Sequence, residues 1–403
     1  MKIGKYKLKI VCRSIYLRGE LNNMHYDVIV IGAGSMGMAA GYFLSKSGKR
    51  TLLLDSFNPP HNKGSHHGDT RIIRHAYGEG EDYVPLALKA QELWHDLEKV
   101  TQKQLFLQTG VLNVGNEKSD FIQNIISSSK RYSLPLHVLD SSEVNKRWSG
   151  ITLPNDYIGC FEPTSGVLKC EECIEAYREL AELHGASILT NSKVKKIIVH
   201  DKKVTIKTEE QTYYSDALVV SAGAWSASLL SMLDLNLPLK PVRKTFAWFD
   251  ANEHLYNHRD FPAFSFETSQ GLYYGFPSIN GSGLKVGRHD GGEKINPDES
   301  ILGFGELEED EADLMQFLND FMPFKQQLKY GKTCMYTLTP DEHFIIDLHP
   351  RYSNVAIASG FSGHGFKFSS VVGQILGELI ISGKTEQNIS PFSINRFIKS
   401  PSN

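Results

Sequence analysis

The sequence predicts a mixed fold, α/β in one domain and α+β in a second domain that is inserted into the first. Three observations predict this division. A strand, a glycine-rich turn, a helix and a second strand follow one another over residues 24–60. Two further apolar strands that end in glycine appear far downstream, near 190–223 and at 354–360. Between these segments the chain carries strands with alternating aromatic residues, a pattern typical of antiparallel sheets.

Length and composition fit a globular protein of two domains. The chain has 403 residues, of which 41% are hydrophobic and 22% charged, and its formal net charge is −3. A chain of this length exceeds one ordinary hydrophobic core. The charge balance and the lack of a long Lys/Arg stripe argue against a nucleic-acid partner. No apolar run reaches the roughly 18–20 residues that a membrane helix needs, so no membrane partner is expected.

The five cysteines are Cys12, Cys160, Cys170, Cys173 and Cys334. Their odd and sparse number gives no disulfide framework and favours a reducing compartment, so a cytoplasmic protein is expected. Cys170 and Cys173 form a C-x-x-C pair, but no second pair accompanies it, and the stretch that it opens reads as a helix. We therefore expect two cysteines at a helix start and no metal site.

Residues 1–23 are basic and have no clear period. Their apolar segment is too short and broken for the core of a signal peptide. We expect an unstructured extension ahead of Met24, with a targeting role as the lesser alternative.

The first folded segment has the features of a nucleotide-binding unit. YDVIVI predicts a buried strand, MAAGYFLSKSG a helix, and RTLLLDS a second strand that ends in Asp55. Gly32, Gly34 and Gly37 form G-x-G-x-x-G in the turn between strand and helix, and Asp55 follows Gly37 by 18 positions. Such glycines let the backbone approach a pyrophosphate at the helix N-terminus, while the acid can bond a ribose hydroxyl. In this context the motif predicts a bound dinucleotide.

Later segments complete the expected element order. The chain predicts a helix near 82–99, strands and short helices over 105–163, a helix near 171–185, strands with tight turns up to Gly223, further strands over 237–340, and a last strand and helix after residue 354. The nucleotide domain is thus discontinuous. We expect it to comprise 24–104, 164–236 and 333–397, with a substrate domain made of 105–163 and 237–332.

This discontinuity favours FAD over a nicotinamide cofactor. A nicotinamide domain is usually compact and close to its motif, whereas a long two-part cofactor fits contacts from the start, middle and end of the chain. No second glycine motif suits NADPH, because GSGLKVG at 281–287 lies between strands and opens no helix. Electrons are therefore expected to leave to O2 or to another acceptor.

Three long segments carry a resemblance to a known family. They are SHHGDTRIIRHAYGEG (65–80), KTCMYTLTPDEHFIIDLHP (332–350) and GFSGHGFKFSS (360–370). The three segments follow the glycine motif along the chain. In this order they resemble the monomeric sarcosine oxidase group, which includes N-methyltryptophan oxidase. The resemblance extends from about Met24 to Phe397.

The resemblance implies a glutathione-reductase-like FAD-binding domain with an inserted antiparallel-sheet substrate domain. It implies an oxidase of the N-methyl C–N bond of secondary amino acids such as sarcosine. With O2 as acceptor, the products would be formaldehyde, the demethylated amino acid and hydrogen peroxide. The expected partners are thus a small N-methyl amino acid and O2, and the expected state is a monomer.

The resemblance also implies a covalent flavin, bound through its 8α-methyl group to Cys334 in KTCMYT. From the residues alone, a cysteine beside Tyr336 and Thr337 could equally be a buried hydrophobe. The full set of expected cofactor-binding residues is Gly32, Gly34, Gly37, Asp55, His66, Arg71, Val194, Gly223, Cys334, Gly363, His364, Gly365 and Lys367.

Lys367 stands between two phenylalanines in GFSGHGFKFSS. A buried ammonium there needs an anionic partner or a lowered pKa. The resemblance places Lys367 and Arg74 around the substrate carboxylate, with Tyr336 lining the same pocket. Arginine offers a planar fork and lysine a point charge, which suits one carboxylate in a dry site. Without the resemblance, Lys367 could be a surface lysine whose stem alone is covered.

The expected catalytic residues are Lys285, His289, Tyr274 and Arg71. In a strand, Lys285 and His289 of LKVGRHD face one way. The resemblance implies that Lys285 activates O2, that His289 and Tyr274 meet the substrate, and that Arg71 lies at the flavin ring, where a cation favours the reduced anion. Each of these residues could instead be a half-buried part of the fold.

One departure leaves the size of the substrate open. Arg288, on the opposite face of the same strand, stands where typical sarcosine enzymes have an aromatic residue. Segments 241–249 and 288–292 favour the N-methyltryptophan branch, and the last third of the chain favours the sarcosine branch. The alternatives are an oxidase of a bulkier N-alkyl amino acid, a flavin dehydrogenase with another acceptor, and a flavin-binding protein without catalysis.

Overall fold

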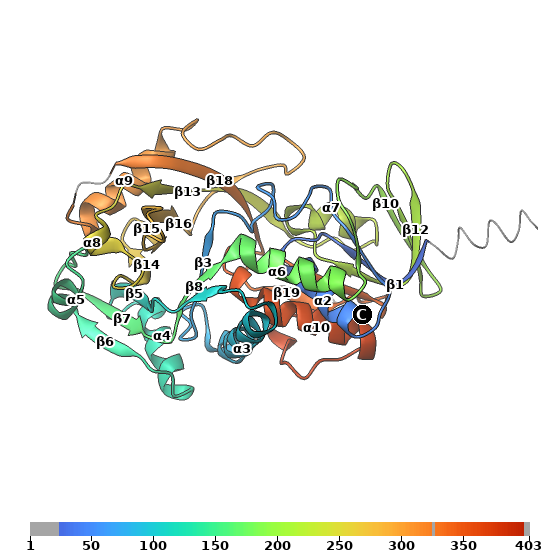
Figure 1. The fold of residues 1–403 in the computed structure, drawn as a ribbon, viewed down its shortest axis with the longest axis horizontal. Coiled ribbons are helices and arrows are strands. Elements are labelled where there is room, and N and C mark those ends of the chain that lie inside the picture. The colour runs from blue at the N-terminus through green and yellow to red at the C-terminus, as the bar shows by residue number, and fades with distance from the viewer. Residues whose placement is uncertain (1–23, 325–326, 399–403) are drawn as a thin grey trace, which may run out of the picture.

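The computed structural model describes residues 24–324 and 327–398. The expected extension at 1–23 lies outside these residues. Figure 1 shows two parts side by side, each built around one large sheet. In the described part of the chain, no helix is long and apolar enough to cross a bilayer.

The helices are α2 (Ser35–Lys46), α3 (Val84–Thr101), α4 (Asp120–Arg131), α5 (Ser141–Arg147), α6 (Cys170–Leu183), α7 (Ser226–Ser231), α8 (Glu253–Tyr256), α9 (Glu309–Phe321) and α10 (Ser369–Ser382). The strands of the first sheet are β1 (His25–Ile31), β2 (Thr51–Leu54), β9 (Ser187–Leu189), β10 (Lys196–His200), β11 (Lys203–Lys207), β12 (Thr212–Val220), β19 (Ile345–Leu348) and β20 (Val355–Ser359). Those of the second are β5 (Val111–Asn116), β6 (His137–Asp140), β7 (Tyr157–Glu162), β13 (Lys240–Phe249), β14 (Ala263–Thr268), β15 (Gly271–Phe276), β16 (Leu284–Arg288), β17 (Glu293–Lys294) and β18 (Leu328–Leu338). A small third sheet contains β3 (Thr70–Ile73), β4 (Phe106–Leu107) and β8 (Gly166–Lys169).

The first sheet brings together the three expected segments. β1 pairs in parallel with β2 on one side and β12 on the other, and β20 adds in parallel to β12. β2 and β20 are buried along their whole length, as are the last four residues of β1 and of β12, which explains the continuous apolar runs of these segments. Helices α2, α3, α6 and α10 share one hydrophobic core on one face, while α7 and the β10–β11 hairpin contribute to the core on the other. The predicted α/β domain with strands from distant segments is confirmed.

The second sheet has nine strands, mostly antiparallel, with one parallel pair between β5 and β14. β18 belongs to this sheet over its whole length, so a domain boundary at residue 332 would divide a strand. Helix α9 packs on the sheet core. Further strands were expected over 237–340, and β13 to β18 confirm them; the helices α8 and α9 were not expected there.

Strand register places several predicted site residues on one face of the second sheet. Residues paired directly across antiparallel strands share a face. Lys285 pairs with Trp248 of β13 and with Phe276 of β15, and Cys334 pairs with Lys244 of β13. Since alternate residues return to the same face, Tyr274, Cys334 and Tyr336 lie on the face that carries Lys285.

Candidate active site

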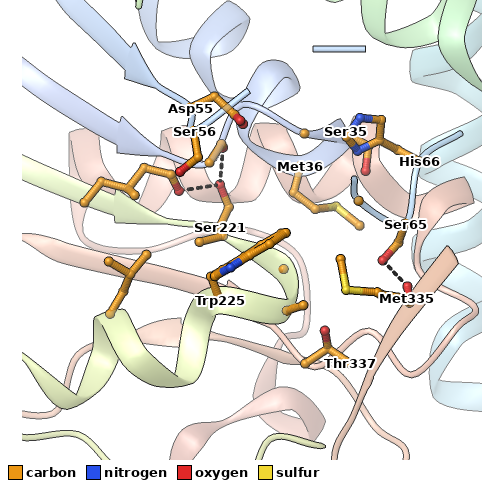
Figure 2. A pocket seen from close by; sticks show the side chains of 18 of the residues that line it. Ser35, Met36, Asp55, Ser56, Ser65, His66, Ser221, Trp225, Met335 and Thr337 are labelled. Atoms are coloured by element: carbon orange, nitrogen blue, oxygen red, sulfur yellow. Dashed lines mark hydrogen bonds between the residues drawn. The ribbon is translucent and has the colours of Figure 1, made fainter. Parts of the chain in front are cut away.

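A cavity of about 340 Å³ lies at the carboxyl ends of β1, β2 and β12. It is lined by residues from the ends of these strands, by residues 64–66, and by the segment after β20. Figure 2 shows Met36, His66, Trp225 and Met335, which come from distant parts of the chain, arranged around this space. Ligands of parallel α/β sheets bind at this end of the strands.

The glycine motif at one end of this cavity suits a pyrophosphate. Helix α2 begins after Gly34, with no side-chain cap and no acidic residue in its first turn, so its N–H groups remain available to an anion. A Cβ at Gly34 would meet only His66 within 4 Å. Gly32 has φ +89°, and a Cβ at Gly37 would lie 1.8 Å from the carbonyl oxygen of Gly32. The motif therefore needs glycine both for its backbone and for the close packing of α2.

Asp55 at the end of β2 holds the glycine turn in place. Its Oδ2 accepts the N–H of Ala33 at 2.8 Å, and its Oδ1 accepts the N–H of Phe57 at 2.8 Å. His61 Nε2 lies 3.4 Å from the same Oδ1. Because a carboxylate has about four acceptor positions, capacity remains for a ribose hydroxyl. These residues fit the adenosine end of a dinucleotide.

Most of the expected cofactor-binding residues line this cavity. They are Gly32, Gly34, Asp55, His66, Arg71, Val194, Gly223, Gly363 and Gly365. Gly37 lies instead in the packing under α2. His364 and Lys367 line a second cavity. Cys334 lines neither cavity, although its neighbours Met335 and Tyr336 line the first.

The second cavity adjoins the first and has a volume of about 70 Å³. Arg71, Tyr336, Gly363 and Phe366 line both. The predicted residues that line the smaller cavity are Arg71, Arg74, Tyr274, His289, Tyr336, His364 and Lys367. The structure thus brings the expected substrate-binding residues together beside the cofactor cavity.

Arg74 already has a carboxylate partner. Its Nη2 donates to both oxygens of Glu79, at 2.6 and 2.7 Å, and its Nη1 donates to Asn113 Oδ1 at 3.3 Å. Although burial opposes ionisation, Arg74 and then His364 and Lys367 hold the pKa of the Glu79 carboxyl below its usual range. An anionic ligand that reached Arg74 would therefore share it with Glu79 or displace Glu79.

Lys367 is buried without a bonded carboxylate. Its Nζ donates to Tyr77 Oη at 3.0 Å and to the carbonyl oxygen of His364 at 2.7 Å, and the residue is 5% exposed. Burial and the nearby Arg74 lower the pKa of Lys367 to about 7, and Glu79 opposes that shift. An anionic ligand in the small cavity would stabilise its charged form.

His364 continues a directed chain of hydrogen bonds from this lysine. Its Nε2 lies 3.1 Å from the carbonyl oxygen of Glu342, which can only accept, so Nε2 carries the proton. Nδ1 then accepts the hydroxyl of Tyr77 at 2.9 Å. Burial lowers the pKa of His364 to about 3 and that of His289 to about 4, so both imidazoles are neutral near pH 7.

Lys285 is buried and lines neither cavity, but it contacts Phe276, which lines the smaller one. Its Nζ donates to the carbonyl oxygens of Gly68 at 2.5 Å and Thr70 at 3.2 Å, and to Thr70 Oγ1 at 3.1 Å. The rings of Phe246 and Phe276 lie 4.6 Å from Nζ, within cation–π range. Burial and then Arg71 lower the pKa of Lys285 to about 7.

Cys334 is a free thiol that is 4% exposed. Burial raises the pKa of this thiol, while the cations Arg71, Lys244 and Lys285 act against that rise. Nearby positive charge favours a thiolate, the form in which cysteine is a nucleophile. Lys244, also buried, was not expected at the site.

Sequence reasoning missed Tyr77 and Glu79. Both lie within the SHHGDTRIIRHAYGEG segment, and the acid follows Arg74 by five residues. An acid so close to a buried arginine was the available signal. Nothing in the sequence indicated that Tyr77 would meet Lys367, 290 positions away.

The expected C-x-x-C at a helix start is confirmed, since α6 begins at Cys170 and both thiols are buried. Among the residues that the structure describes, no group of three or more His, Cys, Asp or Glu side chains is placed to hold a metal ion.

A cavity whose glycine motif suits a dinucleotide thus lies beside a small cavity that Arg74 and Lys367 line. The model of the FAD dependent oxidoreductase family matches residues 27–379, and the chain belongs to this family. Its cofactor is FAD, which the first cavity fits.

Two groups of relatives resemble nearly the whole chain. Monomeric sarcosine oxidase of Bacillus sp. (strain NS-129) is 56% identical over 375 residues, which cover 92% of this chain and 97% of that protein. N-methyl-L-tryptophan oxidase of Salmonella heidelberg (strain SL476) is 42% identical over 375 residues, which cover 93% of this chain and 100% of that protein.

Solved structures share the fold. L-proline dehydrogenase from P. horikoshii superimposes with a TM-score of 0.82 at 21% identity, covering 92% of this chain and 97% of that one. The open form of NikD, described as an unusual amino acid oxidase, gives a TM-score of 0.80 at 22% identity over the same shares. At such identities the likeness shows the fold alone.

Proposed function

We propose that this chain is a flavoprotein oxidase that demethylates N-methyl amino acids, with sarcosine as its preferred substrate. Sarcosine, O2 and water would yield glycine, formaldehyde and hydrogen peroxide. The observation that carries the proposal is the small cavity beside the FAD cavity, in which Arg74 and Lys367 converge. The higher identity to monomeric sarcosine oxidase than to N-methyl-L-tryptophan oxidase supports the small substrate.

The size of the small cavity also matches sarcosine better than a bulkier N-alkyl amino acid. Its volume of about 70 Å³ is roughly one fifth of the 340 Å³ of the cofactor cavity. Ile72, Leu272 and Phe276 close its walls with apolar groups. Such a space suits a ligand of a few heavy atoms better than one that carries an indole.

FAD, when bound, supplies the acceptor for two electrons from the N-methyl group and passes them to O2. Arg74 and Lys367 would bind the substrate carboxylate and so orient the methyl group. The neutral imidazole of His289 offers a nitrogen that can accept the N–H of the substrate amine. The apolar walls would limit the access of water once a ligand is bound, which would strengthen these charge contacts. Lys285 would hold positive charge where O2 becomes an anion.

Glu79 competes with the substrate for Arg74 in this account. Glu79→Gln should therefore bind the carboxylate inhibitor methylthioacetate about tenfold more tightly, since a repelling charge leaves the cavity and Arg74 is released. Flavin absorbance changes during titration measure the affinity. Glu81→Gln, an exposed carboxylate that pairs with Arg131, is the matched control. Equal or weaker binding by Glu79→Gln would show that the Arg74–Glu79 pair does not oppose the ligand.

We further propose that the flavin is covalent, linked through its 8α-methyl group to Cys334 Sγ. The cluster of Arg71, Lys244 and Lys285 supports this, because these cations act against the rise that burial causes in the pKa of the Cys334 thiol and so stabilise a thiolate as it forms. Yellow fluorescence should stay with the chain after acid precipitation and on a denaturing gel, and Cys334→Ser should abolish it. Cys160→Ser, a buried cysteine at another site, should keep it. Release of free FAD by acid from the parent protein would exclude the bond.

The enzyme is also proposed to be a monomer of the reducing cytoplasm. The four cysteines of the described residues are all free and buried, which fits that compartment. Light scattering on the purified protein should give the mass of one chain.

A peroxide-coupled panel tests the proposed function. The panel is sarcosine, N-methyltryptophan, proline and fructosyl-valine, assayed in air. The highest kcat/KM should be for sarcosine, with one peroxide per turnover. A preference for N-methyltryptophan would assign the bulkier substrate, and turnover without peroxide would assign a dehydrogenase; either result contradicts the proposal.

A further inference from the structure

One peptide group lies between Lys285 and a carboxylate. The carbonyl oxygen of Gly68 accepts Lys285 Nζ at 2.5 Å. The N–H on the other side of that same peptide belongs to Asp69, and it donates to Glu171 Oε2 at 3.0 Å. The sequence of groups is therefore carboxylate, peptide N–H, peptide carbonyl and ammonium. Hydrogen bonds in such a chain polarise one another and strengthen each other.

The carboxylate of Glu171 also holds this turn in its shape. Gly68 has φ +96° and Asp69 has φ +69°, two successive residues in the left-handed region. For an aspartate that conformation is uncommon and must be stabilised by its surroundings. Glu171 Oε1 accepts the Gly68 N–H at 2.6 Å, so two consecutive N–H groups converge on one carboxylate. Such a pair of N–H groups forms an anion-binding concavity.

The geometry points to Glu171 as the counter-charge of Lys285. We propose that it acts through the Gly68–Asp69 peptide group as a positioning residue, which keeps the ammonium charged and in place for O2. The inference rests on the proposed function, because it assumes that Lys285 serves the reaction with O2. Glu171 itself touches neither cavity.

The charged surroundings of Lys285 give the sign of this effect. The groups that face it are Arg71 on β3, His67 and Asp69 in the turn, Cys170 and Glu171 on α6, and Cys334 on β18. Arg71 disfavours a second cation, and burial acts in the same direction. Cys170, Asp69 and Glu171 oppose both and raise the pKa of Lys285. Burial raises the pKa of the Cys170 thiol, which is therefore neutral, and the side chain of Asp69 is exposed and screened by water. Glu171 is the better shielded of the two carboxylates.

The pKa of Lys285 is the direct readout. Protein labelled with carbon-13 at the lysine ε-carbon can be titrated by NMR, and the Lys285 signal is the one missing from Lys285→Met. Glu171→Gln keeps an acceptor for the turn but removes the charge, so it should lower this pKa by about one unit. Glu172→Gln, its exposed neighbour on α6, should leave the pKa unchanged. An unchanged pKa in Glu171→Gln would overturn the proposal.

The pH dependence of flavin reoxidation gives a second readout, with the flavin reduced chemically so that no substrate is needed. Well below both pKa values, Glu171→Gln and the parent should react with O2 at similar rates. Well above them, the variant should be about tenfold slower, since the charged fraction falls tenfold per pKa unit. A loss that is equal at every pH would indicate a merely structural role and overturn the proposal.

Two further variants keep the test decisive. Should Glu171→Gln not fold, Glu171→Asp, which keeps the charge but retracts it, should lower the pKa by a smaller amount; no change would refute the counter-charge. Lys285→Met separates the proposed role of Lys285 in the reaction with O2 from the proposed role of Glu171 as its counter-charge. If it reoxidises as fast as the parent, the proposed role of Lys285 is wrong. If it is slow and Glu171→Gln matches the parent at every pH, only the role of Glu171 is wrong.

Discussion

Lys285→Met is expected to slow the reaction of reduced flavin with O2 by about 100- to 1,000-fold, the cost of removing one preorganised group that meets developing charge in a dry site. The first electron converts O2 into an anion, and Lys285 is a buried lysine close to Arg71, which lines the cofactor cavity. Reduction of the flavin by sarcosine without air should change only a few-fold, because that step forms no anion at this position. Stopped-flow absorbance measures the two half-reactions separately.

Lys240→Met is the matched control for this prediction. Lys240 is an exposed residue at the start of β13, in the same sheet, and its removal should leave both rates unchanged. Equal losses of oxidation and reduction in Lys285→Met would reject the role in O2 activation.

Lys367→Ala and Arg74→Ala are each expected to weaken the binding of methylthioacetate about 10- to 150-fold, since a charge-assisted hydrogen bond in a dry site contributes roughly 1.5–3 kcal/mol. The affinity for uncharged amines should fall much less, because these ligands have no carboxylate to contact Arg74 and Lys367. The double variant Lys367→Ala/Arg74→Ala should lose less binding free energy than the sum of the two single losses, since both groups contact one carboxylate. Inhibitor titrations followed by flavin absorbance measure the affinities, with bound flavin as the check of folding.

Arg74→Ala leaves the Glu79 carboxylate without its partner, so part of its effect would come from that buried charge. Comparing the double variant Arg74→Ala/Glu79→Gln with the single variant Glu79→Gln isolates the effect of losing the arginine. In the parent, binding of methylthioacetate should weaken as pH rises through about 7, because Lys367 loses its proton in that range. Undiminished affinity in Lys367→Ala would show that the lysine does not bind the carboxylate.

The α/β domain could be predicted because its signals are local. Gly32 and Gly37 are required by one turn and one helix packing contact, and both requirements appear within six residues of sequence. Helix α9 had a local signal as well. Leu314, Phe317, Leu318 and Phe321 repeat at helical spacing and are all buried. The expectation of strands there followed the aromatic residues of the neighbouring segments and overlooked this period.

The site could be predicted only in part. Motif resemblance pointed to Arg74, Lys367 and Tyr336, and these residues do line one cavity. It did not indicate that Arg74 is held by Glu79. Nor did it indicate how Glu171 meets the turn at Gly68, a contact between residues 103 positions apart. Such contacts depend on how β3, α6 and the second sheet pack together, and one sequence carries no local signal for that packing.

The fate of the methyl carbon tests the central claim most directly. Sarcosine labelled with carbon-13 in its methyl group should be turned over in air, and the products quantified by NMR together with peroxide. The account predicts that all the label appears in formaldehyde, with one glycine and one hydrogen peroxide per formaldehyde. Label that remains in methylamine would place oxidation on the other carbon of the amine, and formaldehyde without peroxide would mean that O2 is not the acceptor; either result would contradict the account.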